Sequence, residues 1–243
     1  MIPKIIHYCW FGRGKMPELA EKCIASWKKY LPEYEFKLWN EDTFDINSNR
    51  FVKEAYNNKK FAFVTDVVRL YALYNNGGIY MDTDVEVLKP LDDFLKYPAF
   101  SGFENDVAIP TGIMASEKGN EWVKRELSYY DNISFIRSNG AFNTKPNVQI
   151  ITEHAYEMGF VANNEFQILN DELVIFPKDF FCPKSYVDGS ITLTENTHCI
   201  HHFAGSWHNE SKFEKKLKKV FGTKLGIRIY KLYNLIRKLI LRL

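Results

Sequence analysis

Apolar and polar residues follow one another along this chain in a pattern that predicts strands and helices in alternation. Short apolar runs at residues 2–10, 34–39 and 78–81 have the length and composition of buried strands. Apolar side chains recur at helical spacing over residues 17–31 and 61–75, and paired glycines end the second of these helices. Alternation of this kind predicts an α/β fold built on a mixed, mostly parallel sheet.

The same alternation continues to about residue 203. Strands are expected at residues 99–103, 112–116, 166–169, 173–176 and 198–203, and helices at about 51–56, 119–131 and 147–158. No internal repeat or low-complexity segment interrupts this region. The pattern predicts a single domain over residues 1–210, followed by a tail over residues 211–243.

The tail differs from the domain in charge and periodicity. It holds eleven lysines and arginines against one acidic residue, Glu214, so the domain is acidic although the whole chain has a net charge of +2. From Lys224 to Leu243 apolar residues repeat every three to four positions beside a basic stripe, which predicts a basic amphipathic helix suited to an anionic membrane surface. The alternative is a terminal helix packed on the domain. An acidic domain argues against a nucleic-acid partner.

Cysteine usage and hydropathy indicate a cytoplasmic protein. The four cysteines are scattered, without the spacing of a metal site, and are expected to be free thiols in a reducing compartment. The N-terminus does not have the pattern of a signal peptide, and no stretch is long and apolar enough to span a bilayer. Together with the tail, this predicts a peripheral protein on the inner face of the cell membrane.

Two carboxylates, Asp82 and Asp84, follow the predicted strand at 78–81. On a strand, residues two apart point to the same side, so both side chains are expected to emerge together at the strand end. Adjacent carboxylates repel each other unless a cation or a shared proton intervenes, and an oxygen-only pair suits Mn²⁺ or Mg²⁺. The alternative is a pair of ordinary turn residues.

A second charged pair, Asp66 and Arg69, lies at positions i and i+3 of the helix before that strand. Their neighbours are apolar, which indicates a helix packed on several sides. A charged pair on a buried helix needs a partner or a function, whereas a surface ion pair would contribute little.

Aromatic and histidine side chains provide further candidates. The segment 201–208 is dense in histidine, and an imidazole could complete a metal site, although such histidines are also common in cores and on surfaces. Trp10, beside a glycine-containing loop, and Trp207 could each stack on a ligand or pack in the core. The chain has no phosphate-binding P-loop motif, no esterase motif and no H-E-x-x-H zinc motif.

Three segments taken together, residues 5–12, 65–69 and 77–84, closely resemble the glycosyltransferases with a DXD sugar-binding region. These are relatives of the yeast initiating mannosyltransferases and of the glucosylating domains of large clostridial toxins. The small size is similar to that of bacterial members that build capsular or other surface polysaccharides. The similarity is dense over residues 2–90 and resumes near 198–208.

The resemblance implies a GT-A fold, a nucleotide-sugar donor, Mn²⁺ or Mg²⁺, and transfer with retention of anomeric configuration. By position, Trp10 would stack on the base, which is usually uracil. Asp66 and Arg69 would hold the donor sugar, with Tyr80 nearby. Asp82 would contact the ribose and the metal.

The resemblance also assigns the remaining metal and donor contacts. Asp84 would ligate the metal directly, and His202 would complete the metal shell. Gly205, which forms an H-x-x-G pattern with His202, would belong to the donor site, and Trp207 would lie over the diphosphate. At the position of His202 the toxin-like members carry an acidic side chain, which is a departure from that pattern.

These expectations combine into one functional hypothesis. The protein would be a metal-dependent, retaining glycosyltransferase that moves a sugar from a nucleotide sugar, with a UDP-sugar favoured, to a lipid-linked glycan in capsular or surface polysaccharide biosynthesis. One alternative is a toxin-like transferase that modifies a protein, although the secretion signal and delivery domains expected of such a toxin are not seen. Another alternative is a catalytically silent nucleotide-sugar binder or membrane scaffold, which would be expected to lose a metal-site residue.

Overall fold

The structure is a computed structural model that describes residues 1–185, 188–204 and 220. The chain divides into two units, Met1–Ala204 and Gly205–Leu243, and the first of these contains the whole sheet. The predicted domain boundary at residue 210 and the predicted tail helix lie outside the described residues, so both stay predictions.

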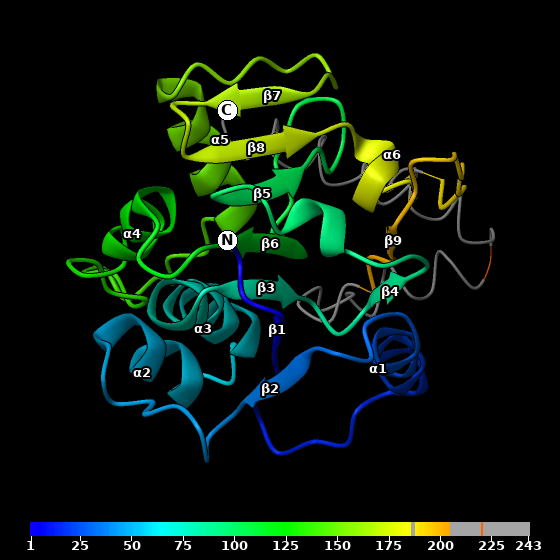
Figure 1. Cartoon of the computed structure of the whole chain (residues 1–243). Coiled ribbons are helices and arrows are strands. Elements are labelled where there is room, and N and C mark those ends of the chain that lie inside the picture. Colours follow the sequence, from blue (N-terminus) through cyan, green and yellow to red (C-terminus); the bar gives the residue numbers. More distant parts are fainter. Residues whose placement is uncertain (186–187, 205–219, 221–243) are drawn as a thin grey trace. The chain divides into compact units, whose positions relative to one another are not determined.

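A seven-stranded mixed sheet forms the centre of the first unit (Figure 1). Strands β2, β1, β3, β5 and β8 run in one direction, whereas β6 and β7 run in the opposite direction. The predicted fold class, an α/β domain with a mixed and mostly parallel sheet, is confirmed. In spatial order the strands are β2 (Glu35–Trp39), β1 (Ile5–Cys9), β3 (Gly78–Met81), β6 (Ile113–Ser116), β5 (Ala99–Gly102), β8 (Leu173–Phe176) and β7 (Gln167–Leu169).

Two short elements that the apolar pattern did not predict complete the unit. Strand β4 (Val85–Val87) pairs antiparallel with β9 (Cys199–His201) in a small second sheet, and α6 (Lys178–Phe181) is a single short turn of helix. Elements of three or four residues are too short to show a period, and β4 depends on a partner far along the chain. Their formation is therefore a tertiary effect.

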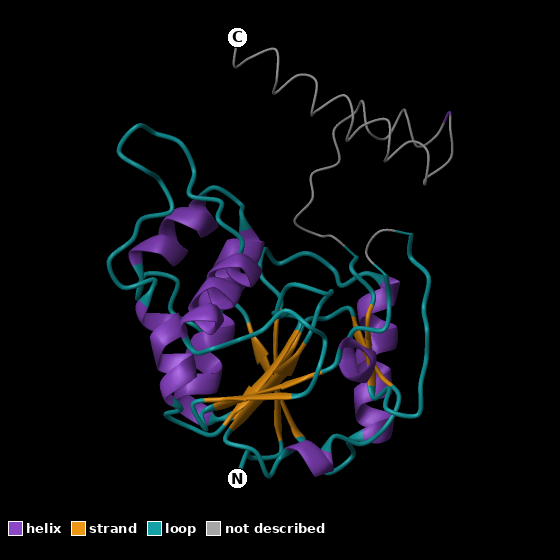
Figure 2. Ribbon diagram, turned by 90° about the horizontal axis from the view of Figure 1, so that it is seen from above, coloured by secondary structure: helices purple, strands orange, loops and turns teal. Residues whose placement is uncertain are grey.

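Helices cover both faces of the large sheet (Figure 2). Within the described part of the chain, none is both long and apolar enough to cross a membrane. Helices α2 to α5 share one apolar core, and α1 packs in the other. The helices are α1 (Glu18–Tyr30), α2 (Arg50–Asn57), α3 (Phe61–Asn76), α4 (Glu121–Ser128) and α5 (Asn147–Glu157), with a 3₁₀ turn, η1, at Asp92–Phe94.

The central strand β3 contributes to both cores because its side chains alternate between the two faces. Ile79 and Met81 pack on one side in the core that contains Trp27 of α1. Tyr80 points to the other side, into the core that contains α3. All four residues of β3 are buried, so a one-residue shift of this strand would place Tyr80 in the wrong core.

Two glycines make the change from α3 to β3 possible. Gly77 and Gly78 both have positive φ angles, +68° and +113°, which other residues rarely adopt. A Cβ atom on Gly78 would lie 2.7 Å from the carbonyl oxygen of Ile5. The paired glycines therefore let the chain leave the helix and run directly against β1.

A buried histidine, His7, fixes this junction. Its Nε2 lies 2.8 Å from the carbonyl oxygen of Gly77, and the indole Nε1 of Trp39 donates to its Nδ1 at 3.1 Å. Both bonds require a neutral ring that carries its proton on Nε2. Burial lowers the pKa of His7 to about 4, so the ring stays neutral at physiological pH and joins β1, β2 and the start of β3.

This junction predicts a loss of stability in acid. Because the pKa of His7 is lower in the folded state than the ordinary value of 6.5, the unfolded state binds the extra proton between pH 6.5 and about 4. The free energy of unfolding should therefore fall as the pH decreases through this window, by about 3 kcal/mol from this residue. Urea unfolding at pH 7 and pH 4 measures the change.

The matched variant is His7→Gln, which keeps a donor and an acceptor but does not titrate. Its free energy of unfolding should depend less on pH over the same interval, since other acidic groups contribute equally in both proteins. Identical pH dependence in the two proteins would contradict this account of His7.

Candidate active site

The candidate site lies where several parallel strands end. Strand β3 ends at Met81, and residues 82–84 form a turn that leads into β4. The amide of Asp82 donates to the carbonyl oxygen of Gly112 at 2.8 Å, and the amide of Val85 donates to that of Asp82 at 3.0 Å. The two carboxylates therefore converge through a turn, and not through strand alternation as the spacing predicted.

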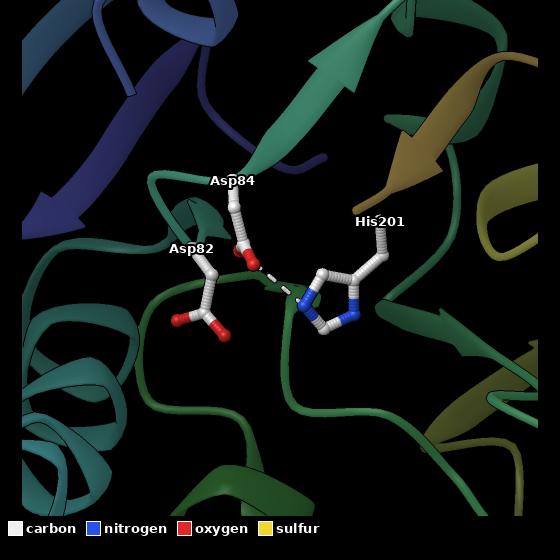
Figure 3. Close-up of side chains that lie close together, drawn as sticks. All are labelled: Asp82, Asp84 and His201. Atoms are coloured by element: carbon white, nitrogen blue, oxygen red, sulfur yellow. Dashed lines mark ion pairs between the residues drawn. The ribbon is translucent and has the colours of Figure 1, made fainter. Parts of the chain in front are cut away.

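Asp82, Asp84 and His201 point toward one another (Figure 3). One ligand atom from each lies within 4.8 Å of the others. His201 arrives because β9 pairs with β4, which places His201 opposite Val85. The Nε2 atom of His201 lies 3.3 Å from Oδ1 of Asp84, and the amide of Ala204 donates to Oδ2 at 2.7 Å.

These contacts set the charge of Asp84. Burial alone would raise the pKa of Asp84, but the hydrogen bonds from His201 and from the amide of Ala204 outweigh it, so the pKa lies below its usual value. Gly112 makes room for the imidazole, because a Cβ atom there would lie 2.6 Å from its Cε1. The geometry keeps an ionised carboxylate next to a second carboxylate and an imidazole.

This donor set fits a divalent cation. Two carboxylate oxygens and one imidazole nitrogen are suitable ligands for Mn²⁺, whereas Mg²⁺ prefers oxygen alone. A cation would also offset the repulsion between Asp82 and Asp84. The residues present therefore match the group that the resemblance implies.

The third predicted ligand, His202, occupies a different place from the one expected. Its Nε2 lies 2.8 Å from Oε2 of Glu86, and its amide donates to the carbonyl oxygen of Asp84 at 2.9 Å. Neighbouring residues at a strand end point to opposite sides, so only one of the two histidines can face the carboxylates in this arrangement. The structure adds His201 as a candidate ligand, and the role of His202 stays a prediction.

The second predicted pair, the partly buried Asp66 and the buried Arg69, lies beside this cluster. Arg69 is 4% exposed. Its Nη2 lies 3.3 Å from Oδ1 of Asp66, and its Nη1 lies 3.4 Å from Oδ1 of Asp82. The guanidinium also lies over the ring of Tyr80 at 4.6 Å, and the hydroxyl of Tyr80 donates to Asp82 at 2.7 Å. Four predicted residues thus form one connected group.

Three residues that sequence reasoning missed support this group. Arg69 donates through Nε to the carbonyl oxygen of Thr65 at 3.1 Å and through Nη1 to that of Thr111 at 2.5 Å. Asn147, at the start of α5, donates to the carbonyl oxygen of Asp66 at 3.3 Å. Threonine and asparagine carry no distinctive spacing here, so only the fold identifies them.

The environment of Asp66 differs from that of Asp84. The pKa of Asp66 is raised to about 6, because burial and the neighbouring charge of Asp82 outweigh the opposite effect of Arg69. Asp66 is therefore more readily protonated than an ordinary aspartate. A carboxyl group in this state can both accept and donate hydrogen bonds, which suits contact with sugar hydroxyls.

Trp10 stands at the end of β1, on the same edge of the sheet as Asp82. Its Nε1 donates to the carbonyl oxygen of Gly14 at 2.6 Å, so the indole is tied to the glycine-containing loop. Glu41 holds that loop from the other side, since it accepts from the amide of Gly12 at 2.6 Å and from the hydroxyl of Tyr56 at 3.0 Å. Gly205 and Trp207, the other predicted donor contacts, lie outside the described residues.

Comparison with known proteins identifies the region that contains this site. Residues 17–101 match the family described as "Glycosyltransferase sugar-binding region containing DXD motif". The resemblance read from the sequence is confirmed over residues 17–101, which are similar to the sugar-binding region of the DXD glycosyltransferases. This region includes Asp66, Arg69, Tyr80, Asp82 and Asp84.

Similar curated proteins are found in yeasts. The chain is 33% identical over 141 residues to inositol phosphoceramide mannosyltransferase 3 of Schizosaccharomyces pombe, covering 55% of this chain and 38% of that protein. It is 27% identical over 150 residues to mannosyl phosphorylinositol ceramide synthase SUR1 of Saccharomyces cerevisiae, covering 56% of this chain and 37% of that protein. The chain therefore spans well under half the length of these relatives. Among solved structures, "PaToxG Glycosyltransferase" is similar with a TM-score of 0.49 and 20% identity, over 64% of this chain and 68% of that one.

The burial of Arg69 predicts a large loss of stability when its charge is removed. Arg69→Met would leave Asp66 and Asp82 close together without their shared cation, and breaking a buried ion pair in this way costs about 3 kcal/mol. The free energy of unfolding from urea denaturation measures this effect. The matched control is Arg13→Met, which removes an exposed bidentate pair with Asp42 and should change stability little. Equal effects of the two substitutions would contradict the proposed importance of Arg69.

Proposed function

We propose that this protein is a metal-dependent glycosyltransferase that transfers a sugar from a nucleotide-sugar donor. The observation that carries the proposal is the convergence of Asp82, Asp84 and an imidazole beside the buried Asp66–Arg69–Tyr80 group. The match of residues 17–101 to the DXD sugar-binding region supports it. In α/β sheets, ligands bind beyond the carboxyl ends of parallel strands, which is where this group lies.

The donor would bind across this edge of the sheet. We assign the base to Trp10, with UDP-sugars favoured, and the sugar to Asp66 and Arg69. Asp82 would contact the ribose and the metal, and Tyr80 would hold Asp82 in place through the hydrogen bond that the structure contains. Gly205 and Trp207 remain candidates for contact with the diphosphate.

Asp82, Asp84 and one histidine would hold the cation, with Mn²⁺ favoured over Mg²⁺. A bound divalent cation would stabilise the negative charge that develops on the leaving diphosphate. Arg69 is fixed by Thr65 and Thr111 before any ligand arrives, so it can orient Asp66 and Asp82 without rearrangement. Transfer with retention of configuration is part of this proposal and rests on the family resemblance.

The acceptor would be a lipid-linked glycan. The name of one yeast relative, inositol phosphoceramide mannosyltransferase 3, refers to a ceramide lipid, which is compatible with an acceptor at a membrane. The basic, leucine-rich tail at 211–243 would bring the protein to an anionic surface on the cytoplasmic side. A role in capsular or surface polysaccharide synthesis belongs to the same proposal.

A catalytically silent binder remains the main competing hypothesis. It predicts that one or more metal-site residues are lost, whereas Asp82, Asp84 and both histidines are present. A protein-modifying transferase would use the same donor site and differ only in its acceptor.

A thermal-shift panel tests the donor site. UDP, GDP and their sugars are each measured with and without Mn²⁺. A UDP-sugar with Mn²⁺ at about 100 times its Kd should stabilise the folded protein by about 2.7 kcal/mol, or about 5–10 °C in Tm. Asp84→Asn should abolish this shift, because it removes one carboxylate charge from the metal site.

Two further variants identify the third ligand. For His201→Asn and His202→Asn, we measure the Mn²⁺ concentration that gives half of the maximal thermal shift. The third ligand is the histidine whose substitution raises this concentration tenfold or more.

In the nucleotide panel, a preference for GDP would move the donor assignment away from uracil. No shift with any nucleotide would favour the silent scaffold.

Removal of residues 212–243 tests the role of the tail. The truncated protein should no longer sediment with vesicles that contain phosphatidylserine, because about 1 kcal/mol of electrostatic attraction is lost for each basic residue near the surface. Hydrolysis of the donor should be unchanged. Continued vesicle binding, or loss of donor hydrolysis together with binding, would contradict a tail that acts only as a membrane anchor.

A further inference from the structure

Glu104 lies at the same edge of the sheet as the candidate site. It follows β5, which ends at Gly102. Strands β3 and β5 both pair antiparallel with β6, so their carboxyl ends lie on one side of the sheet (Figure 1). Asp82 is the first residue after β3 and Glu104 is the second residue after β5, so both follow strands that end at this edge.

The main chain holds Glu104 in place. Its amide donates to the carbonyl oxygen of Ala108 at 2.8 Å, which closes a short loop after the strand. Within that loop the side chain of Asn105 accepts from the amide of Val107 at 2.9 Å. The carboxylate of Glu104 is partly buried and interacts electrostatically with His201 and Asp82. Its side chain therefore belongs to the candidate site.

Glu104 has no hydrogen bond or ion pair from its side chain to any of the residues that the structure describes. The other carboxylates of the site all have partners: Asp66 has Arg69, Asp82 has Tyr80, and Asp84 has His201. A partly buried carboxylate without a partner has lost some hydration and received nothing in return. Such a group is expected where a ligand supplies the missing donor.

The nearby Asp106 provides a contrast. Its carboxylate pairs with Nζ of Lys178 at 2.8 Å, and its side chain is 78% exposed. The two acidic residues are two positions apart in one loop, yet it is Glu104 that interacts electrostatically with His201 and Asp82. The loop thus carries one exposed carboxylate that is paired with Lys178 and one carboxylate that has no side-chain partner among residues 1–185, 188–204 and 220.

The missing partner is best explained by a hydroxyl group. A carboxylate can only accept hydrogen bonds while it is ionised, so its ligand must donate one. Glu104 is not one of the residues whose ligand atoms converge within 4.8 Å, which are Asp82, Asp84 and His201. A direct role in binding the same cation is therefore not supported by the geometry.

We propose that Glu104 binds and orients the hydroxyl group that attacks the donor sugar. This inference rests on the proposed glycosyltransferase function, and it assigns to Glu104 the contact with the attacking hydroxyl group. The carboxylate would accept a hydrogen bond from a hydroxyl of the acceptor, or from water when the donor is hydrolysed. This contact directs a lone pair of the hydroxyl oxygen toward the anomeric carbon, and orientation of this kind lowers the barrier without any covalent bond to Glu104. As the bond from that oxygen to the anomeric carbon forms, the bond from the anomeric carbon to the diphosphate breaks, and the hydroxyl proton passes to the departing diphosphate.

The test is the variant Glu104→Gln, with donor hydrolysis as the reaction because water serves as the nucleophile. Glutamine keeps the shape of the side chain but is a weaker acceptor and carries no charge. We expect kcat for hydrolysis of the UDP-sugar in Mn²⁺ to fall at least tenfold, while the donor KM and the UDP-induced thermal shift change less than twofold. The Tm should equal or exceed that of the wild type, because an unpaired carboxylate near Asp82 has been removed.

Asp106→Asn is the matched control, and it should leave the rate, the donor KM and the thermal shift unchanged. A wild-type rate in Glu104→Gln would overturn the inference. A lower Tm or a parallel loss of UDP binding would also overturn it, because either result would indicate a structural or donor-binding role.

These outcomes are separate from failure of the proposed function. If the wild-type protein neither binds nor hydrolyses any nucleotide sugar, the glycosyltransferase proposal fails and the inference about Glu104 fails with it. If the wild type is active and only the Glu104→Gln result is negative, the donor site stands and the assignment of Glu104 is wrong.

Discussion

The buried guanidinium of Arg69 is the interaction on which the candidate site depends. It lies between Asp66 of α3 and Asp82 after β3, and it also packs over the ring of Tyr80. Without this cation, two carboxylates would face each other in a poorly hydrated space, an arrangement that costs several kcal/mol. Two further bonds to main-chain oxygens fix its orientation. Arg69 therefore links the helix that carries one half of the site to the strand that carries the other.

Arg69 alone does not balance the charge of the site, which holds the four carboxylates Asp66, Asp82, Asp84 and Glu104. Although burial lowers the pKa of His201, its hydrogen bonds to Asp84 and Cys182 raise that pKa well above the usual value, so the imidazole adds a second positive charge. Two positive charges still leave an excess of negative charge, and the anionic diphosphate of a nucleotide sugar would add to it. Close negative charges of this kind are stable only with a bound cation or with protonation. The raised pKa of Asp66 is one response to this excess. Binding of a divalent cation at Asp82 and Asp84 is the response that would also permit a diphosphate to enter.

The local parts of this structure could be predicted from the sequence. The helix at 61–76 and the strand at 78–81 follow from apolar periodicity and from two glycines, which are signals contained in a few consecutive residues. The proximity of Asp66 to Arg69 follows from helical geometry in the same way. These predictions succeeded because the interactions that determine them are short in sequence.

The parts that could not be predicted depend on pairing between distant segments. Strand β4 exists because β9 lies beside it, and the register of this pair places His201 opposite Val85. A shift of one residue in that register would exchange His201 and His202, and no local feature of the histidine-rich segment determines which of them faces Asp84. The supporting contacts of Thr111 and Asn147 likewise depend on the fold alone.

The distribution of satisfied and unsatisfied polar groups separates structural roles from roles in binding. His7 has partners on both ring nitrogens, and Arg69 has partners on all three of its guanidinium nitrogens, so these residues make up the rigid part of the molecule. Glu104 is fixed by its main chain while its carboxylate has no partner among the described residues. A site whose framework is already satisfied does not need to reorganise when a ligand binds, and its unsatisfied groups are those left for the ligand to complete. Under the proposed function, the donor side of the site would be largely preformed around Arg69, and Glu104 would mark the side from which the second substrate enters.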